Sequence, residues 1–175
     1  MKKPIIIGID PSGAYNEGLG TTGFGILDPD GKPWDHCIVR ATEYASQLEY
    51  WTGVLGTIDL YARSTDHPPI LSIEDYVLYG SSAKAQINSE METSKLIGAI
   101  CVHGYQQGYR MTIRNAAQVK KRWSNKVLEH KNIIYRKGNR IVDQHGESIS
   151  PHSLDALRHA LHCYHFDIKK GRWLK

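Results

Sequence analysis

The segment from Pro4 to Asp10 constrains the fold of this chain more than any other feature of its sequence. Its isoleucines favour the extended conformation, and a strand that is apolar on both faces is typical of a sheet covered on both sides. Asp10 ends this strand on the same face as Ile6 and Gly8, at the edge where open α/β sheets carry their ligand groups. The sequence therefore predicts a layered α/β domain with a carboxylate at one edge of its sheet.

The residues after Asp10 predict a meander of three strands. A glycine-rich segment, Ser12–Thr21, leads into a second apolar strand at Thr22–Leu27. The residues Asp28-Pro29-Asp30-Gly31 are typical of a turn, and Trp34–Val39 is expected to pair with the second strand as a hairpin. The first three elements are therefore predicted to be strands.

The rest of the chain alternates predicted helices with two short strands. Apolar side chains at helical spacing indicate the helices, and a Ser150 cap followed by Pro151 marks the start of the last one. The polar stretch Lys131–Ser150 has no clear periodicity. The β-β-β-α-β-α-β-α order predicts a mixed five-stranded sheet flanked by helices. The elements after the meander are expected at Ser46–Tyr61 (helix), Ile70–Glu74 (strand), Ala83–Tyr105 (long helix), Met111–Ile113 (strand), Ala116–Trp123 and Lys126–His130 (short helices) and Ser150–Phe166 (last helix).

Length and composition fit one domain over residues 1–175. The chain has 175 residues, 41% of them hydrophobic, which supports a sizeable core without disulfides or metals. No run approaches the roughly 18 apolar residues of a membrane span, and the first residues are too short a stretch for a signal peptide, so a cytoplasmic location is expected. Cys37, Cys101 and Cys163 are expected to be small core side chains in a reducing compartment.

Basic residues concentrate between Arg110 and Arg140, where Glu129 is the only acidic residue. The formal net charge of the whole chain is only +4, so this local excess is more informative than the total. It indicates a polyanionic partner, and a solvated helix and loop surface is the alternative interpretation. The cations are Arg110, Arg114, Lys120, Lys121, Arg122, Lys126, Lys131, Arg136, Lys137 and Arg140.

A second strand-end acid, Glu74, ends the predicted strand Ile70–Glu74. If this strand is a neighbour of the first one, the carboxylates of Asp10 and Glu74 point to the same spot, and Asp75 faces the other side of the sheet. The alternative is that each acid simply belongs to a turn after its strand. The pair therefore indicates a ligand site only if the two strands are adjacent.

The last predicted helix has one polar arc, formed by His152, Asp155, His159 and His162. Leucines occupy the opposite side, so one face is expected to pack while the other presents ligand groups. Asp155 lies one turn from His152, within reach of one shared ion. The alternative is the ordinary polar face of a surface helix.

Several short motifs, in the same order over nearly the whole chain, resemble the RuvC-type Holliday junction resolvases of the RNase H-like superfamily. The segment Ser12–Thr21 is longer than the tight glycine turn of the cellular enzymes, so the phage-encoded members are the better likeness. The resemblance implies an RNase H-like fold and a bacterial or phage-infected host cytoplasm. The motifs are Ile9-Asp10-Pro11 followed by Thr22-Gly23-Phe24-Gly25-Ile26, then Ile73-Glu74, Ala117-Gln118-Val119-Lys120 and His152-Ser153-Leu154-Asp155-Ala156-Leu157.

The resemblance implies a crossover junction endodeoxyribonuclease, which resolves Holliday junctions or other branched DNA by paired hydrolysis of phosphodiester bonds. It implies metal ligands at Asp10, Glu74 and Asp155, with His152 where family members carry a histidine or another acid. Clustered carboxylates repel one another unless cations neutralise them, and their hard oxygens suit two Mg²⁺ or Mn²⁺ ions. The implied products carry a 5′-phosphate and a 3′-hydroxyl. His152 is either a ligand or a group that assists proton transfer.

The resemblance also implies a surface for a four-way DNA junction. Tyr76 or Tyr79 is expected to stack on an unpaired base, with packing against the long helix as the alternative. Lys120 resembles the family lysine near the scissile phosphate, and the glycines of Ser12–Thr21 are expected to let the backbone pass close to DNA. Two symmetric cuts require two active sites, so a homodimer with the helix Ala83–Tyr105 at its interface is expected. The other expected phosphate contacts are Lys121, Arg122 and Lys126.

Other interpretations of the sequence are weaker. Actin-like and sugar-kinase ATPases share the RNase H-like core but close two such domains over a nucleotide, and this chain has length for one. A zinc site at His159, His162, Cys163 and His165 needs four converging ligands, and His165 projects from a different side of the helix. The serious rivals are a related nuclease that cuts flaps or replication forks and a junction-binding protein without catalysis.

Overall fold

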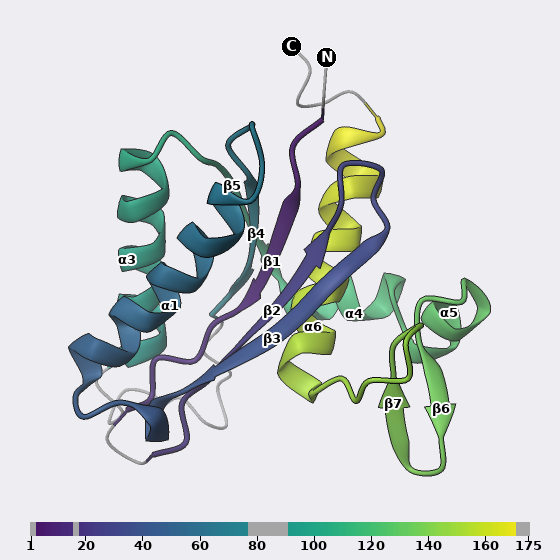
Figure 1. Ribbon diagram of the computed structural model, residues 1–175, viewed down its shortest axis with the longest axis horizontal. Coiled ribbons are helices and arrows are strands. Elements are labelled where there is room, and N and C mark those ends of the chain that lie inside the picture. Colours follow the sequence, from purple (N-terminus) through teal and green to yellow (C-terminus); the bar gives the residue numbers. More distant parts are fainter. Residues whose placement is uncertain (1–2, 16–17, 77–90, 171–175) are drawn as a thin grey trace.

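The computed structural model describes residues 3–15, 18–76 and 91–170, and Figure 1 shows a central sheet with helices on both faces. Its strands are β1 (Ile6–Asp10), β2 (Thr21–Leu27), β3 (Pro33–Arg40), β4 (Ile70–Asp75), β5 (Arg110–Asn115), β6 (Tyr135–Lys137) and β7 (Arg140–Val142). Its helices are α1 (Gln47–Arg63), α3 (Glu92–Gln106), α4 (Ala116–Arg122), α5 (Asn125–His130) and α6 (Pro151–Cys163), with shorter turns at Ala41–Glu43 and Tyr164–Ile168.

The main sheet has five strands in the order β3-β2-β1-β4-β5. β2 pairs antiparallel with both β1 and β3, whereas β4 is parallel to β1 and β5 is parallel to β4. Ile6 is paired with Ile70 and Ile9 with Ile73, so β1 and β4 begin together and β4 ends one residue later than β1. The predicted mixed five-stranded sheet is therefore confirmed, including the adjacency of the first and fourth strands.

One face of the sheet is covered by α1 and α3. Ile5, Ile7 and Ile9 alternate onto this face and are almost completely buried. They share a core with apolar side chains of both helices, among them Val54 on α1 and Leu96 on α3. This burial explains why every second residue of the first strand must be apolar.

The opposite face of the sheet is covered by α6, which packs most closely on β1 and β2. Three glycines, at positions 8, 23 and 25, let the helix approach. A Cβ atom at Gly8 would lie 1.9 Å from the Ala156 carbonyl oxygen, and one at Gly23 would lie 2.2 Å from the carbonyl carbon of His152. Because these glycines have no side chain, the backbone of the first turns of α6 packs directly against the backbone of the sheet.

The glycine-rich segment after β1 is tied to the start of α3. The backbone N–H of Gly13 donates to Thr93 Oγ1 at 3.1 Å, and that of Tyr15 donates to the buried Glu92 carboxylate at 2.9 Å. A Cβ atom at Gly13 would lie 2.1 Å from the Glu92 carbonyl oxygen. Close packing therefore accounts for a glycine at position 13, and the expected approach to DNA is not needed to explain it.

The polar stretch without clear periodicity, Lys131–Ser150, contains the β6–β7 hairpin, which the sequence analysis did not predict. The two strands pair antiparallel around Gly138, which has a φ of +62°, and Asn139. The hairpin projects beside α5 in Figure 1. Ile141 of β7 and Ile149, which comes later in the same stretch, join the core under α6. The Gly-Asn pair was the available signal, because it is a common two-residue hairpin turn.

The long helix predicted over Ala83–Tyr105 differs at its start. Residues 83–90 lie outside the described residues, and Met91 has a left-handed φ of +54°, so α3 begins at Glu92. The last α-helix, α6, ends at Cys163, and a wider helical turn follows it over Tyr164–Ile168.

The three cysteines are free thiols, and only Cys163 is fully buried, whereas Cys37 and Cys101 are half-buried. The prediction that all three lie in the core is therefore confirmed only for Cys163. Within residues 3–15, 18–76 and 91–170, no helix has both the length and the apolar character needed to cross a bilayer.

Candidate active site

Asp10 and Glu74 lie side by side at the carboxyl edge of the sheet. Ile9 of β1 is paired with Ile73 of β4, and each acid is the next residue of its strand. Their side chains are only 15% and 16% exposed. The strand adjacency that the sequence left open therefore places two carboxylates at one edge, in a largely desolvated position.

The helix α6 adds His152 and Asp155 from above this edge. The close approach at Gly23 brings the first turn of α6 against β2, and His152 Nδ1 lies 2.8 Å from Asp10 Oδ2. One turn later, Asp155 Oδ2 lies 2.8 Å from the Nζ atom of Lys120 on α4. We call Asp10, Glu74, His152 and Asp155 the carboxyl-edge cluster.

The pKa values in this cluster show that its charges interact. Burial raises the pKa of Asp10, the hydrogen bond with His152 opposes this, and the negative charges of Glu74 and Asp155 raise it further. The hydrogen bond with Asp10 raises the pKa of His152, and burial opposes it. Burial disfavours the charge on Lys120, but its contact with Asp155 outweighs burial and raises the lysine pKa. The acids of the cluster are therefore electrostatically coupled to one another and to His152 and Lys120.

The ligand atoms of the carboxyl-edge cluster do not all converge on one point. Among the described residues, the ligand atoms that lie within 4.8 Å of one another belong to His36, Asp143 and Glu147, and the carboxyl-edge cluster does not meet this separation. We call these residues the hairpin-base cluster, because Asp143 and Glu147 follow β7 and His36 lies on β3. Both groups carry ligand types suited to a metal ion.

Sequence reasoning missed the part played by Arg158. Its guanidinium contacts Asp155, donates from Nε to the Trp123 carbonyl at 2.9 Å and also contacts Asn125 Oδ1. The side chain is only 13% exposed, so these contacts hold a cation in place beside Asp155. The available signal was its spacing of three residues from Asp155 on the same helix.

His159 departs from the predicted polar face of the last helix. Its side chain has no exposed surface, so the expectation that this arc presents groups to a ligand fails at this position. His152, by contrast, is 45% exposed and Asp155 is 18% exposed. The predicted polar arc is therefore interrupted by a buried residue at position 159, whereas His162 is partly exposed.

The residues predicted to contact DNA have different surroundings. Tyr76 is half-buried against the core between the sheet and α1 and α3, and Tyr79 lies outside the described residues. Lys121 and Lys126 are exposed. Arg122 is also exposed, with its guanidinium carbon 5.0 Å from the centre of the Phe166 ring. Lys121, Arg122 and Lys126 are therefore accessible to a ligand that binds near Lys120.

No protein-family model and no curated protein sequence matches this chain. Its fold is nevertheless RNase H-like, of the kind seen in RuvC. A structure described as T. thermophilus RuvC in complex with Holliday junction substrate aligns with a TM-score of 0.64 and 15% identity, covering 96% of each chain. A second structure, of Thermus thermophilus RuvC, aligns with a TM-score of 0.61 and 17% identity, covering 95% of this chain and 96% of the other.

Proposed function

We propose that this chain is a metal-dependent, structure-selective endonuclease that resolves Holliday junctions or other branched DNA. In this proposal residues 1–175 form one nuclease domain, and paired hydrolysis leaves 5′-phosphate and 3′-hydroxyl ends. The observation that carries it is the placement of Asp10 and Glu74 at the ends of adjacent parallel strands, beneath His152 and Asp155 of α6. The longer connection Ser12–Thr21 supports a phage-type member.

The residues of the carboxyl-edge cluster fit Mg²⁺ or Mn²⁺. Asp10, Glu74 and Asp155 offer hard oxygen ligands. Burial, with a smaller contribution from the charges of Glu74 and Asp155, raises the pKa of Asp10, and a bound cation would stabilise its ionised form. Two such ions, when bound, supply an activated water and stabilise the departing oxygen. His152 lies against Asp10 and serves as a ligand or as the group that holds a proton there.

The cations beside the cluster suit the other half of the reaction, which is the binding of phosphate. Lys120 and Arg158 both contact Asp155, and Lys120 is 44% exposed. A phosphodiester at this point draws on the same positive charges, which orient it without reading the base sequence. We further propose that Lys121, Arg122 and Lys126 bind backbone phosphates and that Tyr76 or Tyr79 stacks on an unpaired base.

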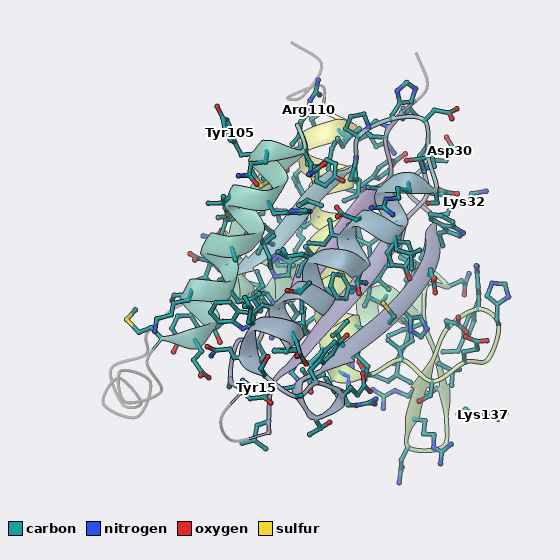
Figure 2. The ribbon with its side chains drawn as sticks, turned by 60° about the vertical axis from the view of Figure 1, so that its left-hand side comes forward. Tyr15, Asp30, Lys32, Tyr105, Arg110 and Lys137 are labelled. Carbon is teal, nitrogen blue, oxygen red and sulfur yellow. The ribbon has the colours of Figure 1, made fainter. Side chains whose placement is uncertain are left out.

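A homodimer is part of the proposal, because two symmetric cuts in a four-way junction require two active sites. The helix α3 supplies a surface for it. Val102 is 59% exposed and Tyr105 is 82% exposed, and Figure 2 shows Tyr105 projecting outward from the helix. These exposed apolar side chains support α3 as the interface.

The test is cleavage of a synthetic four-way junction with Mg²⁺ or Mn²⁺, compared with a flap, a fork and a linear duplex of the same sequence. Paired symmetric nicks in the junction are expected. Preferential cutting of flaps or forks would instead assign a related RNase H-like nuclease. Tight junction binding without cutting under any metal condition would assign a non-catalytic binding protein.

A further inference from the structure

We propose that His159 is a positioning residue that holds the Glu74 carboxylate in place for metal binding, by donating its Nε2–H to Glu74 Oε2. The inference rests on the proposed function, because it concerns a ligand of the same metal site. It adds a residue that lies beneath the site, one turn after Asp155 on α6.

The first observation is the burial of His159 together with the lack of partners for its ring. The side chain is 0% exposed, and neither Nδ1 nor Nε2 has a hydrogen-bond partner among the described residues. Buried polar atoms in proteins are nearly always hydrogen-bonded, because a buried group without a partner loses its hydrogen bonds to water and gains none in exchange. A fully buried imidazole of this kind therefore needs an explanation.

The second observation is the atom that the ring faces. His159 Nε2 lies 3.2 Å from Glu74 Oε2, which is a hydrogen-bond length. Glu74 Oε2 is itself buried and also lacks a hydrogen-bond partner of good geometry. Two buried, chemically complementary atoms, each without another hydrogen-bond partner, thus lie at hydrogen-bond distance from each other.

The backbone holds the ring at this point. Ser72 Oγ donates to the His159 carbonyl at 2.9 Å, and Ser72 precedes Glu74 by two residues on the same face of β4. The helix is therefore pinned to the strand that carries the ligand, next to the ligand itself. The geometry keeps Nε2 beside Oε2, and in this proposal Glu74 Oε1 is the oxygen that binds the cation.

A hydrogen bond to one oxygen of a ligating carboxylate orients the other oxygen toward the metal. Removing such outer partners in metalloproteins commonly lowers metal affinity by about 10–100-fold. His159→Phe keeps an aromatic ring in the cavity but removes the donor. His159→Gln places an amide N–H near the position of Nε2, whereas His159→Asn places it near that of Nδ1.

The experiment is a calorimetric titration of DNA-free protein with Mn²⁺, with thermal unfolding as a check on folding. We expect His159→Phe to weaken Mn²⁺ binding about 10–100-fold, and His159→Gln to recover most of the loss while His159→Asn does not. His162→Phe is the matched control. His162 lies on the same helix, but its ring stacks on Phe166, with 4.5 Å between the ring centres. Its Mn²⁺ affinity is expected to stay within about twofold of wild type.

Glu74→Gln separates failure of this inference from failure of the proposed function. If Glu74→Gln loses Mn²⁺ affinity but a folded His159→Phe keeps it, the positioning role is overturned and the metal site stands. If Glu74→Gln binds Mn²⁺ as wild type does, both proposals fall. If His159→Phe does not fold, the comparison of Gln with Asn decides, because equal affinities in those two folded variants overturn the inference.

Discussion

The carboxyl-edge cluster and the hairpin-base cluster offer similar ligand atoms in very different settings. In the hairpin-base cluster, Asp143 Oδ1 accepts the backbone N–H groups of His145 and Glu147 at 2.9 and 2.8 Å, so this acid already shapes a turn. Its other oxygen lies 3.7 Å from His36 Nε2, which links the base of the hairpin to β3. Asp10 and Glu74, by contrast, lie at the carboxyl ends of two strands of the central sheet, where neither shapes a turn.

The comparison shows that short distances between ligand atoms can have a purely structural explanation, whereas the reactive centre that we propose is the looser cluster. The hairpin-base cluster is tighter, but its contacts are explained by the hairpin that they hold. The carboxyl-edge cluster is looser, but its acids repel one another and are met by the cations Lys120 and Arg158. Acids gathered with cations at the carboxyl edge of a sheet, without a turn or hairpin that explains them, are typical of functional sites.

The largest expected effect separates the two clusters by activity. Asp10→Asn should abolish junction cutting, a loss of about 4 kcal/mol of transition-state stabilisation or roughly 10³-fold in rate, because a metal ligand is lost. Junction binding should persist, since Asp10 is not among the proposed DNA contacts. Asp143→Asn is the matched control, because the amide oxygen still accepts the two N–H groups, and it should cut at the wild-type rate. Equal losses in the two variants would contradict the distinction drawn here.

The sequence was sufficient for some parts of the two clusters and not for others. Asp10 and Glu74 were predictable because strand ends are local features, and the regular order of elements places them together. The hairpin-base cluster was not, because His36 meets Asp143 through β6–β7, whose short polar strands have no hydrophobic period. The burial of His159 was not either, because helical spacing gives a face but not what covers it.

The second prediction tests whether the carboxyl-edge cluster depends on the close contact between α6 and the sheet. Gly23→Ala would place a methyl group 2.2 Å from the backbone of His152, so the helix must move outward. We expect a loss of about 1–3 kcal/mol in the free energy of unfolding, together with weaker cutting. Chemical denaturation and a junction assay on the folded fraction measure the two effects.

Gly56→Ala is the control for this substitution, because a Cβ atom there meets nothing within 4 Å. In the interior of α1 it should be neutral or stabilise the protein by up to about 1 kcal/mol. A Gly23→Ala protein as stable and active as Gly56→Ala would show that α6 does not need to lie so close to β2.

The third prediction concerns the hairpin-base cluster alone. Asp143→Ala removes the acceptor for two backbone N–H groups, so the turn after β7 should lose about 1–2 kcal/mol of stability. Asp143→Asn keeps an acceptor and should lose much less. Denaturation midpoints of both variants are the measurement, and a metal-dependent midpoint abolished by either variant would show that this cluster binds an ion after all.

The smallest expected effect is a pH dependence that originates behind the carboxyl-edge cluster. Burial, helped by the positive charge of Arg114, lowers the pKa of His162 to about 4, against an ordinary value near 6.5. Between these two values the unfolded chain binds a proton that the folded protein does not, so stability falls as the pH is lowered through this range. Because His162 is only partly buried, solvent screening reduces the effect to about 1 kcal/mol between about pH 7 and pH 5. His162→Gln removes the titrating group and should lose correspondingly less stability over that range, whereas the exposed control His130→Gln should follow wild type. Parallel pH profiles for wild type and His162→Gln would contradict the lowered pKa of His162.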